Sequence, residues 1–216
     1  TLAARLVHSE KLLAALTPSG KFDLAESLIK SLLTPQLPLS LLGTLHLELA
    51  TCCWQQNKLR EAEHYALSAM DISERADEPL LGLSAQQTLV IIHSKRGQLL
   101  KANELIENCL CHPLIENEPL IHGRVIFDQS NTLAHAGASI DLVRSLRLKA
   151  LQVFEQSGTL SPIQNSAVWL GMANFLIEAD LLDEGSAALD KALAISHKTG
   201  YIRGIHFGGL IEAALK

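Results

Sequence analysis

The segment Gly97–Ala102, "GQLLKA", decides the fold, because its pattern occurs four more times along the chain. The related segments are "GKFDLA" at 20–25, "NKLREA" at 57–62, "GASIDLV" at 137–143 and "DLLDEG" at 180–185. Each begins with a helix-ending residue, continues with a large apolar residue and closes on a small or short one. The closing residues, spaced 37, 40, 41 and 42 positions apart, are Ala25, Ala62, Ala102, Val143 and Gly185. Such even spacing indicates an internal repeat.

A second small residue follows seven positions after most of these closing residues. The residues at this place are Ala69, Cys109, Ala150 and Ala192, with Leu32 as the exception. Seven positions are about two turns of an α-helix, so both small residues lie on one face. Small side chains on that face allow a neighbouring helix to approach closely.

Helical patterns lie on both sides of each turn. First helices are expected over 39–55, 79–96, 119–136 and 161–179, and second helices over 59–75, 99–111, 140–156 and 183–198. Residues 2–16 and 22–33 form an earlier pair, and 200–216 resemble a first helix without a partner. Pro and acidic residues separate the pairs and stop or start helices there. The sequence therefore predicts one all-α solenoid domain over 1–216, with about five antiparallel helix pairs and a terminal helix.

Composition narrows the function classes. Hydrophobic residues make up 48% of the 216 residues, aromatic residues only 4%, and the net charge is −5. This charge argues against direct contact with nucleic acid, which needs a basic surface. No run of 18 uncharged apolar residues and no signal peptide is visible, so we expect a cytoplasmic protein without membrane contact. The first residue is Thr1, which suggests a fragment of a longer protein or a processed chain.

The stretch "CLCHP" at 109–113 is the most suggestive candidate for a metal or redox site. Zinc sites commonly use two ligand pairs at wider spacing, and the other cysteines, Cys52 and Cys53, are adjacent. A metal site and a reversible disulfide of Cys53 with a later cysteine remain alternatives. The simpler interpretation makes Cys109 a packing residue, and any role of Cys111 and His112 stays open.

Catalytic signatures are missing from the sequence. None of the nine histidines forms H-E-x-x-H, and neither G-x-S-x-G nor a phosphate-binding glycine loop occurs. We therefore expect no enzyme activity, no cofactor and no metal, with an enzyme of unrecognised type as the competing hypothesis. The charge run "RSLRLK" at 144–149 is expected on a solvated convex face, with a docking patch as the alternative.

The repeat resembles the tetratricopeptide (TPR) family. The fourth full unit shows the resemblance best. Trp169 is its early aromatic residue, and Met172 and Ala173 are its pair of a Leu-like and a small residue. Gly185 and Ala192 are the small residues of its second helix. The resemblance implies a right-handed superhelix. Units of about 40 residues, and the segment "ALAISHKTGYIRG" at 192–204, are similar to the sensor domains of MalT-like transcriptional regulators, to related signalling ATPases and to kinesin light chains.

The resemblance implies that first helices line a concave groove that binds a protein, a peptide or a small effector. The groove residues expected from the repeat are Thr51, Trp54, Gln87, Ile91, Lys95, Arg124, Phe127, Asn131, His135 and Asn174. Asn amides both donate and accept hydrogen bonds, which suits an extended peptide. We expect either the sensor domain of a transcriptional regulator, in a bacterium, or a stand-alone scaffold. The apolar face of the terminal helix could also drive homodimerisation.

Overall fold

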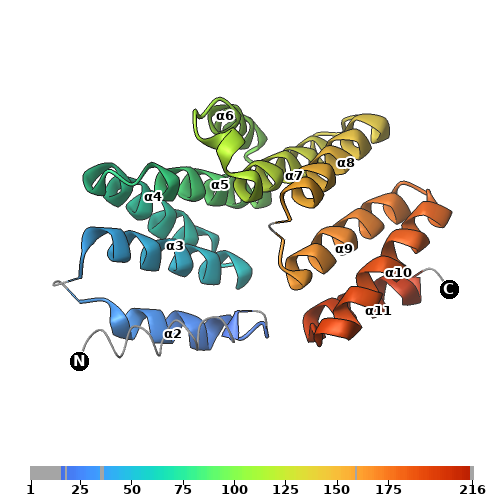
Figure 1. Cartoon of the computed structure of the whole chain (residues 1–216), viewed down its shortest axis with the longest axis horizontal. Coiled ribbons are helices and arrows are strands. Elements are labelled where there is room, and N and C mark those ends of the chain that lie inside the picture. Colours follow the sequence, from blue (N-terminus) through green and yellow to red (C-terminus); the bar gives the residue numbers. More distant parts are fainter. Residues whose placement is uncertain (1–15, 18, 35–36, 159, 215–216) are drawn as a thin grey trace. The chain divides into compact units, whose positions relative to one another are not determined.

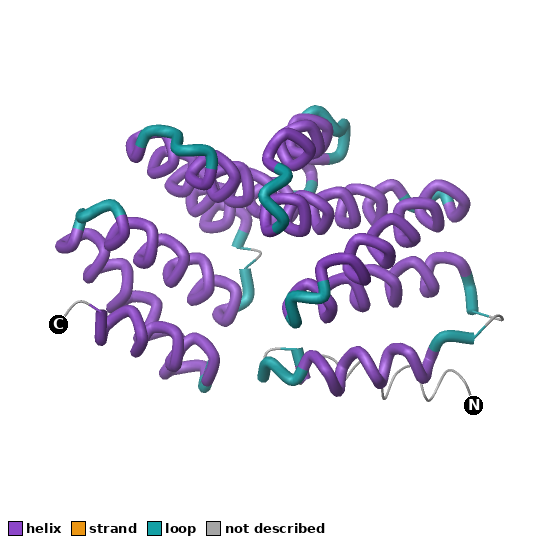
Figure 2. Tube along the Cα trace, turned by 180° about the vertical axis from the view of Figure 1, so that it is seen from behind, coloured by secondary structure: helices purple, strands orange, loops and turns teal. Residues whose placement is uncertain are grey.

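The computed structural model describes residues 16–17, 19–34, 37–158 and 160–214 (Figure 1). The predicted helix over 2–16 lies almost wholly outside these residues. The helices are α2 (Phe22–Leu32), α3 (Leu39–Gln55), α4 (Leu59–Ala76), α5 (Pro79–Lys95), α6 (Leu99–Leu110), α7 (Pro119–His135), α8 (Ile140–Ser157), α9 (Pro162–Glu178), α10 (Leu182–Thr199) and α11 (Ile202–Ala214). A 3-10 turn, η1 (Ile115–Asn117), precedes α7. No strand occurs in the described part of the chain, and Figure 2 shows helices joined by short loops.

Contacts divide the chain into two compact units. Unit 1 holds α2 to α7 and α8 as far as Ala150, and unit 2 holds the rest of α8 and α9 to α11. The expectation of one domain over 1–216 stays a prediction.

The turn inside each helix pair has the conformation that its residue type predicts. The helix-ending residues of the five repeated segments all have a positive φ, between 61° and 78°: Gly20, Asn57, Gly97, Gly137 and Asp180. Gly, Asn and Asp tolerate this left-handed backbone better than other residues do. In each turn the next amide donates to a carbonyl five residues earlier, as Lys58 N does to Cys53 O at 2.9 Å. This bond satisfies a helix-end carbonyl and reverses the chain.

The small residues of the repeat are core residues, as predicted. Ala25, Ala62 and Ala102 have no exposed surface, and Val143 is 1% exposed. Seven residues further on, Ala69, Cys109, Ala150 and Ala192 are also fully buried, and even the exception Leu32 is only 3% exposed. Small residues at these places let the second helix lie close to its neighbours.

First helices of successive pairs pack on one another as well as on their own second helices. In unit 1, α5 contacts both α3 and α7, while α4 packs between α3 and α5. In unit 2, α9 contacts α10 and α11. The first helices α3, α5 and α7 thus form a row in unit 1, and the candidate site lies on this row. No helix among the described residues is both long and apolar enough to span a membrane.

One expectation about the surface is wrong. Arg147, from the charge run "RSLRLK", is 6% exposed rather than solvated. Its Nη2 donates to Asn131 Oδ1 at 2.8 Å, and its guanidinium lies 5.1 Å from the centre of the Phe127 ring. A guanidinium can be buried when its charge meets a ring face and an amide oxygen, and sequence spacing does not reveal such partners.

Candidate functional site

We define the first-helix face by the residues of α3, α5 and α7 at and beside the predicted groove positions. Its members are Glu48, Thr51, Trp54, Gln87, Ile91, Lys95, Arg124, Phe127, Asp128, Asn131 and His135, all in unit 1. Lys95, Arg124 and His135 are exposed, and most of the others are half-buried. Gln87 is only 7% exposed. Nine of the ten predicted groove residues therefore belong to neighbouring helices of one unit.

Asn174 is the tenth predicted residue and belongs to unit 2. It is half-buried on α9, where its Nδ2 donates to Glu178 Oε1, one turn later, at 2.8 Å. Its amide is thus engaged within its own helix. The pairing of Asn174 with Asn131 in one binding groove stays a prediction.

Polar side chains connect α5 to α7 across the first-helix face. Gln87 Nε2 donates to Asp128 Oδ2 at 2.6 Å. One to two turns further along, the hydroxyls of Ser94 and Thr132 lie 2.5 Å apart. Both contacts are partly shielded from water, so each costs free energy if its partner is removed. They hold the two helices in one register and orient Asp128 within the face.

A cationic side chain lies over each of two aromatic rings on the face. Lys95 Nζ lies 5.5 Å from the centre of the Trp54 ring, and Arg147 lies over Phe127. These contacts are of the cation–π type, worth about 0.5–1 kcal/mol at exposed sites. Trp54 and Phe127 are both half-buried.

Two acidic residues of the face were missed by the sequence reasoning. Glu48 on α3 and Asp128 on α7 are half-buried and lie two repeats of 40 residues apart. The equivalent residue of the repeat between them is Thr88 on α5. Burial raises the pKa of Glu48, and Arg124 counteracts this. Burial also raises the pKa of Asp128 to about 7, against the opposing effects of Gln87 and Arg124. A detectable signal existed: Asp128 directly follows the groove position Phe127, and Glu48 lies at the equivalent place 80 residues earlier.

Arg124 interacts with both acids, although Glu48 precedes it by 76 residues. The side chain is exposed, yet desolvation by the surrounding protein lowers its pKa. The predicted concave groove stays a prediction.

The stretch "CLCHP" ends a helix, as its position in the repeat predicts. Helix α6 stops at Leu110 with Cys111 as its cap. Cys109 is fully buried, its Sγ lies 3.7 Å from Gln86 Oε1, and burial raises its pKa to about 12. A protonated, buried thiol is a packing residue rather than a metal ligand. Cys111 is exposed, and His112 Nδ1 accepts a hydrogen bond from the Leu114 amide.

His112 also lines a cleft of about 230 Å³ in unit 1. The cleft lies where α4 ends and α5 begins, and its apolar part includes Met70 and Leu83. The remaining lining residues are Ser73, Glu74, Asp77, Glu78, Pro79, Gly82 and Gln86. None of the predicted groove residues contributes to it.

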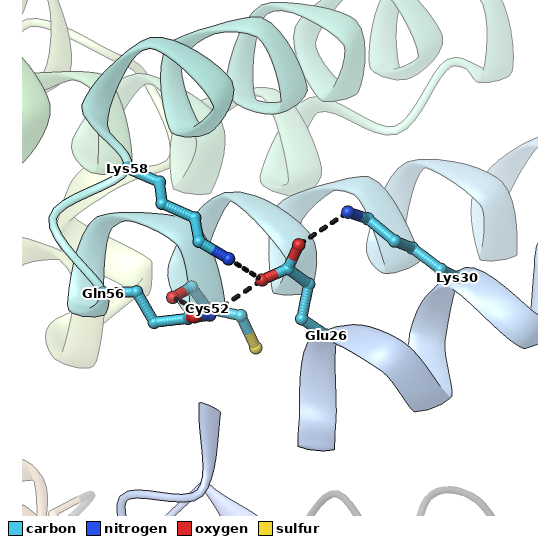
Figure 3. Close-up of polar contacts among 5 residues, drawn as sticks. All are labelled: Glu26, Lys30, Cys52, Gln56 and Lys58. Carbon is cyan, nitrogen blue, oxygen red and sulfur yellow. Dashed lines mark hydrogen bonds and ion pairs between the residues drawn. The ribbon is translucent and has the colours of Figure 1, made fainter. Parts of the chain in front are cut away.

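Glu26, Cys53 and Glu61 place one potential metal ligand each within 4.8 Å of one another. However, cationic side chains already occupy Glu26: Lys30 Nζ donates to Oε1 at 2.6 Å, and Lys58 Nζ to Oε2 at 2.8 Å (Figure 3). Gln56 Nε2 donates to Oε2 at 2.8 Å as well. Burial raises the pKa of Cys53 to about 11, so its thiol is protonated at neutral pH. The cluster therefore suits an ion-pair network better than a metal ion.

The Glu26 network stabilises the ionised carboxylate strongly. Burial alone would raise the pKa of Glu26, but the hydrogen bonds from Lys30, Lys58 and Gln56 lower it to about 2. Glu26 belongs to α2, while Gln56 and Lys58 form the turn between α3 and α4. The network thus joins one repeat to the turn of the next.

Comparison with solved structures identifies the fold. The chain is similar to BtubC (BKLC) from P. vanneervenii, with 15% identity, a TM-score of 0.62, and coverage of 92% of this chain and 82% of that one. It is also similar to the nearly identical TPR-like repeats of a kinesin light chain-like protein from Podosopora anserina, with 19% identity, a TM-score of 0.50, and coverage of 90% and 96%. A substituted form of that protein gives a TM-score of 0.51 at 19% identity, with coverage of 91% of this chain and 96% of that one.

The fold is a TPR-like helical repeat. No family model and no curated protein sequence matches the chain. At 15–19% identity the similarity is one of architecture, and the function has to be inferred from the side chains of this chain.

Proposed function

We propose that the protein is a non-catalytic binding module whose first-helix face binds an extended segment of a partner protein. The supporting observation is the composition of this face. It combines two half-buried aromatic residues, Trp54 and Phe127, with the exposed cation Arg124 and the half-buried acid Glu48. Apolar anchors beside directional polar groups are what peptide recognition uses. The TPR-like fold supplies a row of first helices to carry them.

Two versions of this function differ in what binding does. In a sensor similar to the MalT-like transcriptional regulators, a peptide, protein or small effector would change the helical array and control a separate output domain. In a scaffold, the face would hold one member of a complex near another. A helix-turn-helix or a nucleotide-binding domain elsewhere in the same protein would favour the sensor. In either version we expect a cytoplasmic protein without direct contact to nucleic acid or membrane.

A charge reversal on the first-helix face tests the binding function. Random 12-residue peptides displayed on phage are selected against the full chain, and the enriched peptides are measured against two variants. We expect Arg124→Glu to weaken their binding at least tenfold. Arg60→Glu, at an exposed position on the second helix α4, is the matched control and should leave it unchanged. Equal binding by both variants would contradict the proposal.

Unit 2 takes part only if Asn174 contributes. The substitutions Asn131→Ala and Asn174→Ala, made separately, distinguish a face confined to α3, α5 and α7 from a longer groove. We expect weaker peptide binding for Asn131→Ala. A loss for Asn174→Ala as well would extend the binding surface to α9.

A homodimer through the terminal helix is a further proposal. On α11, Phe207 is 45% and Leu210 is 70% exposed. In the preceding first helix, α9, Met172 is only 2% exposed. Lys191 Nζ of α10 lies 4.5 Å from the centre of the Trp169 ring in that helix. Light scattering at several concentrations tests the dimer, and a monomer at every concentration would exclude it.

A further inference from the structure

The side-chain amide of Asn131 is held in place by an arginine from the following helix. Asn131 is half-buried on α7, and Arg147 lies on α8 within the same unit. Arg147 Nη2 donates to Asn131 Oδ1 at 2.8 Å. Arg147 is only 6% exposed, and its guanidinium lies 5.1 Å from the centre of the Phe127 ring. A buried guanidinium that also lies over a ring has little freedom to move, so it fixes the amide.

This contact determines which end of the amide is left for another partner. A guanidinium has only N–H donors, so the amide atom beside it must be the oxygen. The NH2 group of Asn131 then remains, with two N–H donors. Within the described residues its Nδ2 makes no hydrogen bond, and it is not among the unpaired polar atoms that are shielded from solvent. Asn131 therefore presents donors at the first-helix face, while its acceptor is already engaged.

Arg124 offers donors on the same side of α7. It precedes Asn131 by seven residues, which is about two turns of helix, so both side chains lie on one face of α7. Arg124 is exposed and makes no hydrogen bond or ion pair in the part of the chain that the structure describes. The ligand group that suits both residues is a hydrogen-bond acceptor.

Charges of both signs around Asn131 argue against an anionic acceptor. The charged residues of the first-helix face and of its support are Lys95, Arg124, Arg147, Glu48 and Asp128. Asp128 precedes Asn131 by three residues, so the two side chains are neighbours on the helix surface. An anion at Asn131 would be repelled by the Asp128 carboxylate and would lose part of its own hydration. A neutral carbonyl oxygen avoids both penalties, and the main chain of a bound segment supplies one at every residue.

We propose that Asn131 is a donor-only contact of the first-helix face, and that Arg147 positions its NH2 group to bind a main-chain carbonyl oxygen of the bound segment. This inference rests on the proposed function and names the ligand group that Asn131 recognises. Arg147 is a positioning residue, because it acts through Asn131. A main-chain carbonyl is present in every peptide, so this contact orients the bound segment without selecting its side chains.

Asn131→Asp tests the direction of this hydrogen bond on the full chain. The probe is the 12-residue peptide that phage selection enriches most strongly, acetylated and amidated and measured by fluorescence anisotropy at pH 8. Aspartate keeps an acceptor for Arg147 but replaces the NH2 group by an oxygen. We expect binding to weaken about tenfold, because a donor is lost and two acceptors then face each other. If Asn131 instead accepted a peptide N–H group, Asn131→Asp would tighten binding, and the inference would be wrong.

Asn108→Asp is the matched control for this variant. Asn108 is exposed on the second helix α6, and its substitution changes the net charge of the protein by the same amount. It should leave binding unchanged. The free energy of unfolding of Asn131→Asp, from urea denaturation, should be at least that of the wild type, because the aspartate forms a charge-assisted hydrogen bond with Arg147.

Substitutions of Arg147 give an independent test in which Asn131 is unaltered. Replacing a buried charged side chain by an apolar one of similar volume is often neutral for stability, so Arg147→Met should fold. We expect it to bind about threefold more weakly, because the released amide is no longer preorganised. Arg147→Lys retains a donor and should restore part of this loss. In an Asn131→Ala background, Arg147→Met should have no further effect on binding, which distinguishes positioning from a general structural role.

Two changes of the peptide identify the acceptor. When every Asp and Glu of the peptide is replaced by Asn or Gln, Asn131→Asp should weaken binding by the same factor as before. When one peptide bond at a time is replaced by an ester, whose carbonyl is a weaker acceptor, one position should weaken binding to the wild type. The same ester should have little further effect on Asn131→Asp. If the acid-free peptide no longer depended on Asn131, the site would bind a side-chain carboxylate, and the inference would be overturned.

The remaining results separate this inference from the proposed function. A peptide that loses affinity with Arg124→Glu but binds Asn131→Asp as tightly as the wild type would overturn the inference and leave the binding function intact. Equal weakening by Arg147→Met with and without the Asn131 amide would overturn the positioning role. If selection enriches no peptide, both the proposed function and the inference are wrong.

Discussion

At the scale of single residues, burial separates the four cysteines into two chemical classes. Cys52, Cys53 and Cys109 are buried, and burial raises their pKa values to about 12, 11 and 12. Only the thiolate is an effective nucleophile, so these three are unreactive in the folded state. Cys111, at the cap of α6, is exposed.

We therefore predict one rapidly reacting thiol in the native protein. A chromogenic disulfide reagent at pH 8 should modify a single cysteine quickly and the other three only as fast as the protein opens. Cys111→Ser should remove the fast phase. Two fast thiols in the wild type would contradict the burial of the other three.

Glu26 is the second residue whose environment makes a measurable prediction. Its pKa is lowered from 4.5 to about 2, so the folded state favours the ionised form by up to about 3 kcal/mol. This stabilisation is present above pH 4.5 and is lost as the pH falls towards 2. Glu26→Gln should lower the free energy of unfolding at pH 7 and flatten its decline between pH 5 and pH 3, as measured by urea denaturation.

Glu61→Gln is the control for this prediction. Glu61 is a member of the same cluster, but it is exposed and has no hydrogen bond or ion pair among the described residues. Its substitution should change the free energy of unfolding by less than about 0.5 kcal/mol. An equal loss of unfolding free energy in both variants would show that the net charge of the protein, rather than the Glu26 network, is responsible.

At the scale of elements, close helix packing depends on glycines with specific neighbours. A Cβ on Gly185 in α10 would lie 2.5 Å from Ile177 Cγ1 and 3.2 Å from the Ile177 backbone nitrogen. Gly209 in α11 has no atom within 4 Å of such a Cβ. Both belong to helices of unit 2, so they form a matched pair.

We predict opposite effects of alanine at these two positions. Gly185→Ala should lower the free energy of unfolding by about 1–3 kcal/mol, because the backbone of Ile177 has to move. Gly209→Ala should stabilise by up to about 1 kcal/mol through helix propensity. Thermal and urea unfolding of the two variants measure this. A stabilising Gly185→Ala would mean that α9 and α10 are less closely packed than described.

The repeat also carries polar contacts between successive pairs. Glu26 and Glu63 each follow the closing residue of a repeated segment by one position. Glu26 binds Lys58 in the next turn, and Glu63 pairs with Arg96 beside the turn after that. The third equivalent position is Asn103, which cannot make the same ion pair. These carboxylates were visible in the sequence, but their partners became clear only from the packing of consecutive turns.

At the scale of the whole molecule, the fold is a TPR-like helical repeat divided into two compact units. In such arrays each repeat contacts mainly its neighbours, so local changes have local effects. Met172 in α9 is 2% exposed and belongs to the core of unit 2. Met172→Ala should lower the free energy of unfolding of unit 2 by about 2–5 kcal/mol.

We predict that this loss is confined largely to unit 2. Hydrogen exchange measured by mass spectrometry on Met172→Ala should rise in α9, α10 and α11 and change little in α3, α4 and α5. Leu49→Ala, at a fully buried position of α3, should give the reverse pattern. An equal rise over both units for either variant would show that the chain unfolds as one cooperative domain.

The sequence alone determined the helical repeat, because helix periodicity, turn residues and small packing residues are local signals. The predicted bounds of the helices lying within the described residues agree with the structure to within two residues, and the five turn residues have the expected backbone. Only the tertiary structure decided which polar groups are buried and paired. Arg147, Asp128 and Glu48 owe their environments to side chains far away in the sequence, and periodicity carries no information on such partners. The first-helix face was therefore predictable as a position in the repeat, whereas its charge chemistry depended on how α3, α5 and α7 pack together.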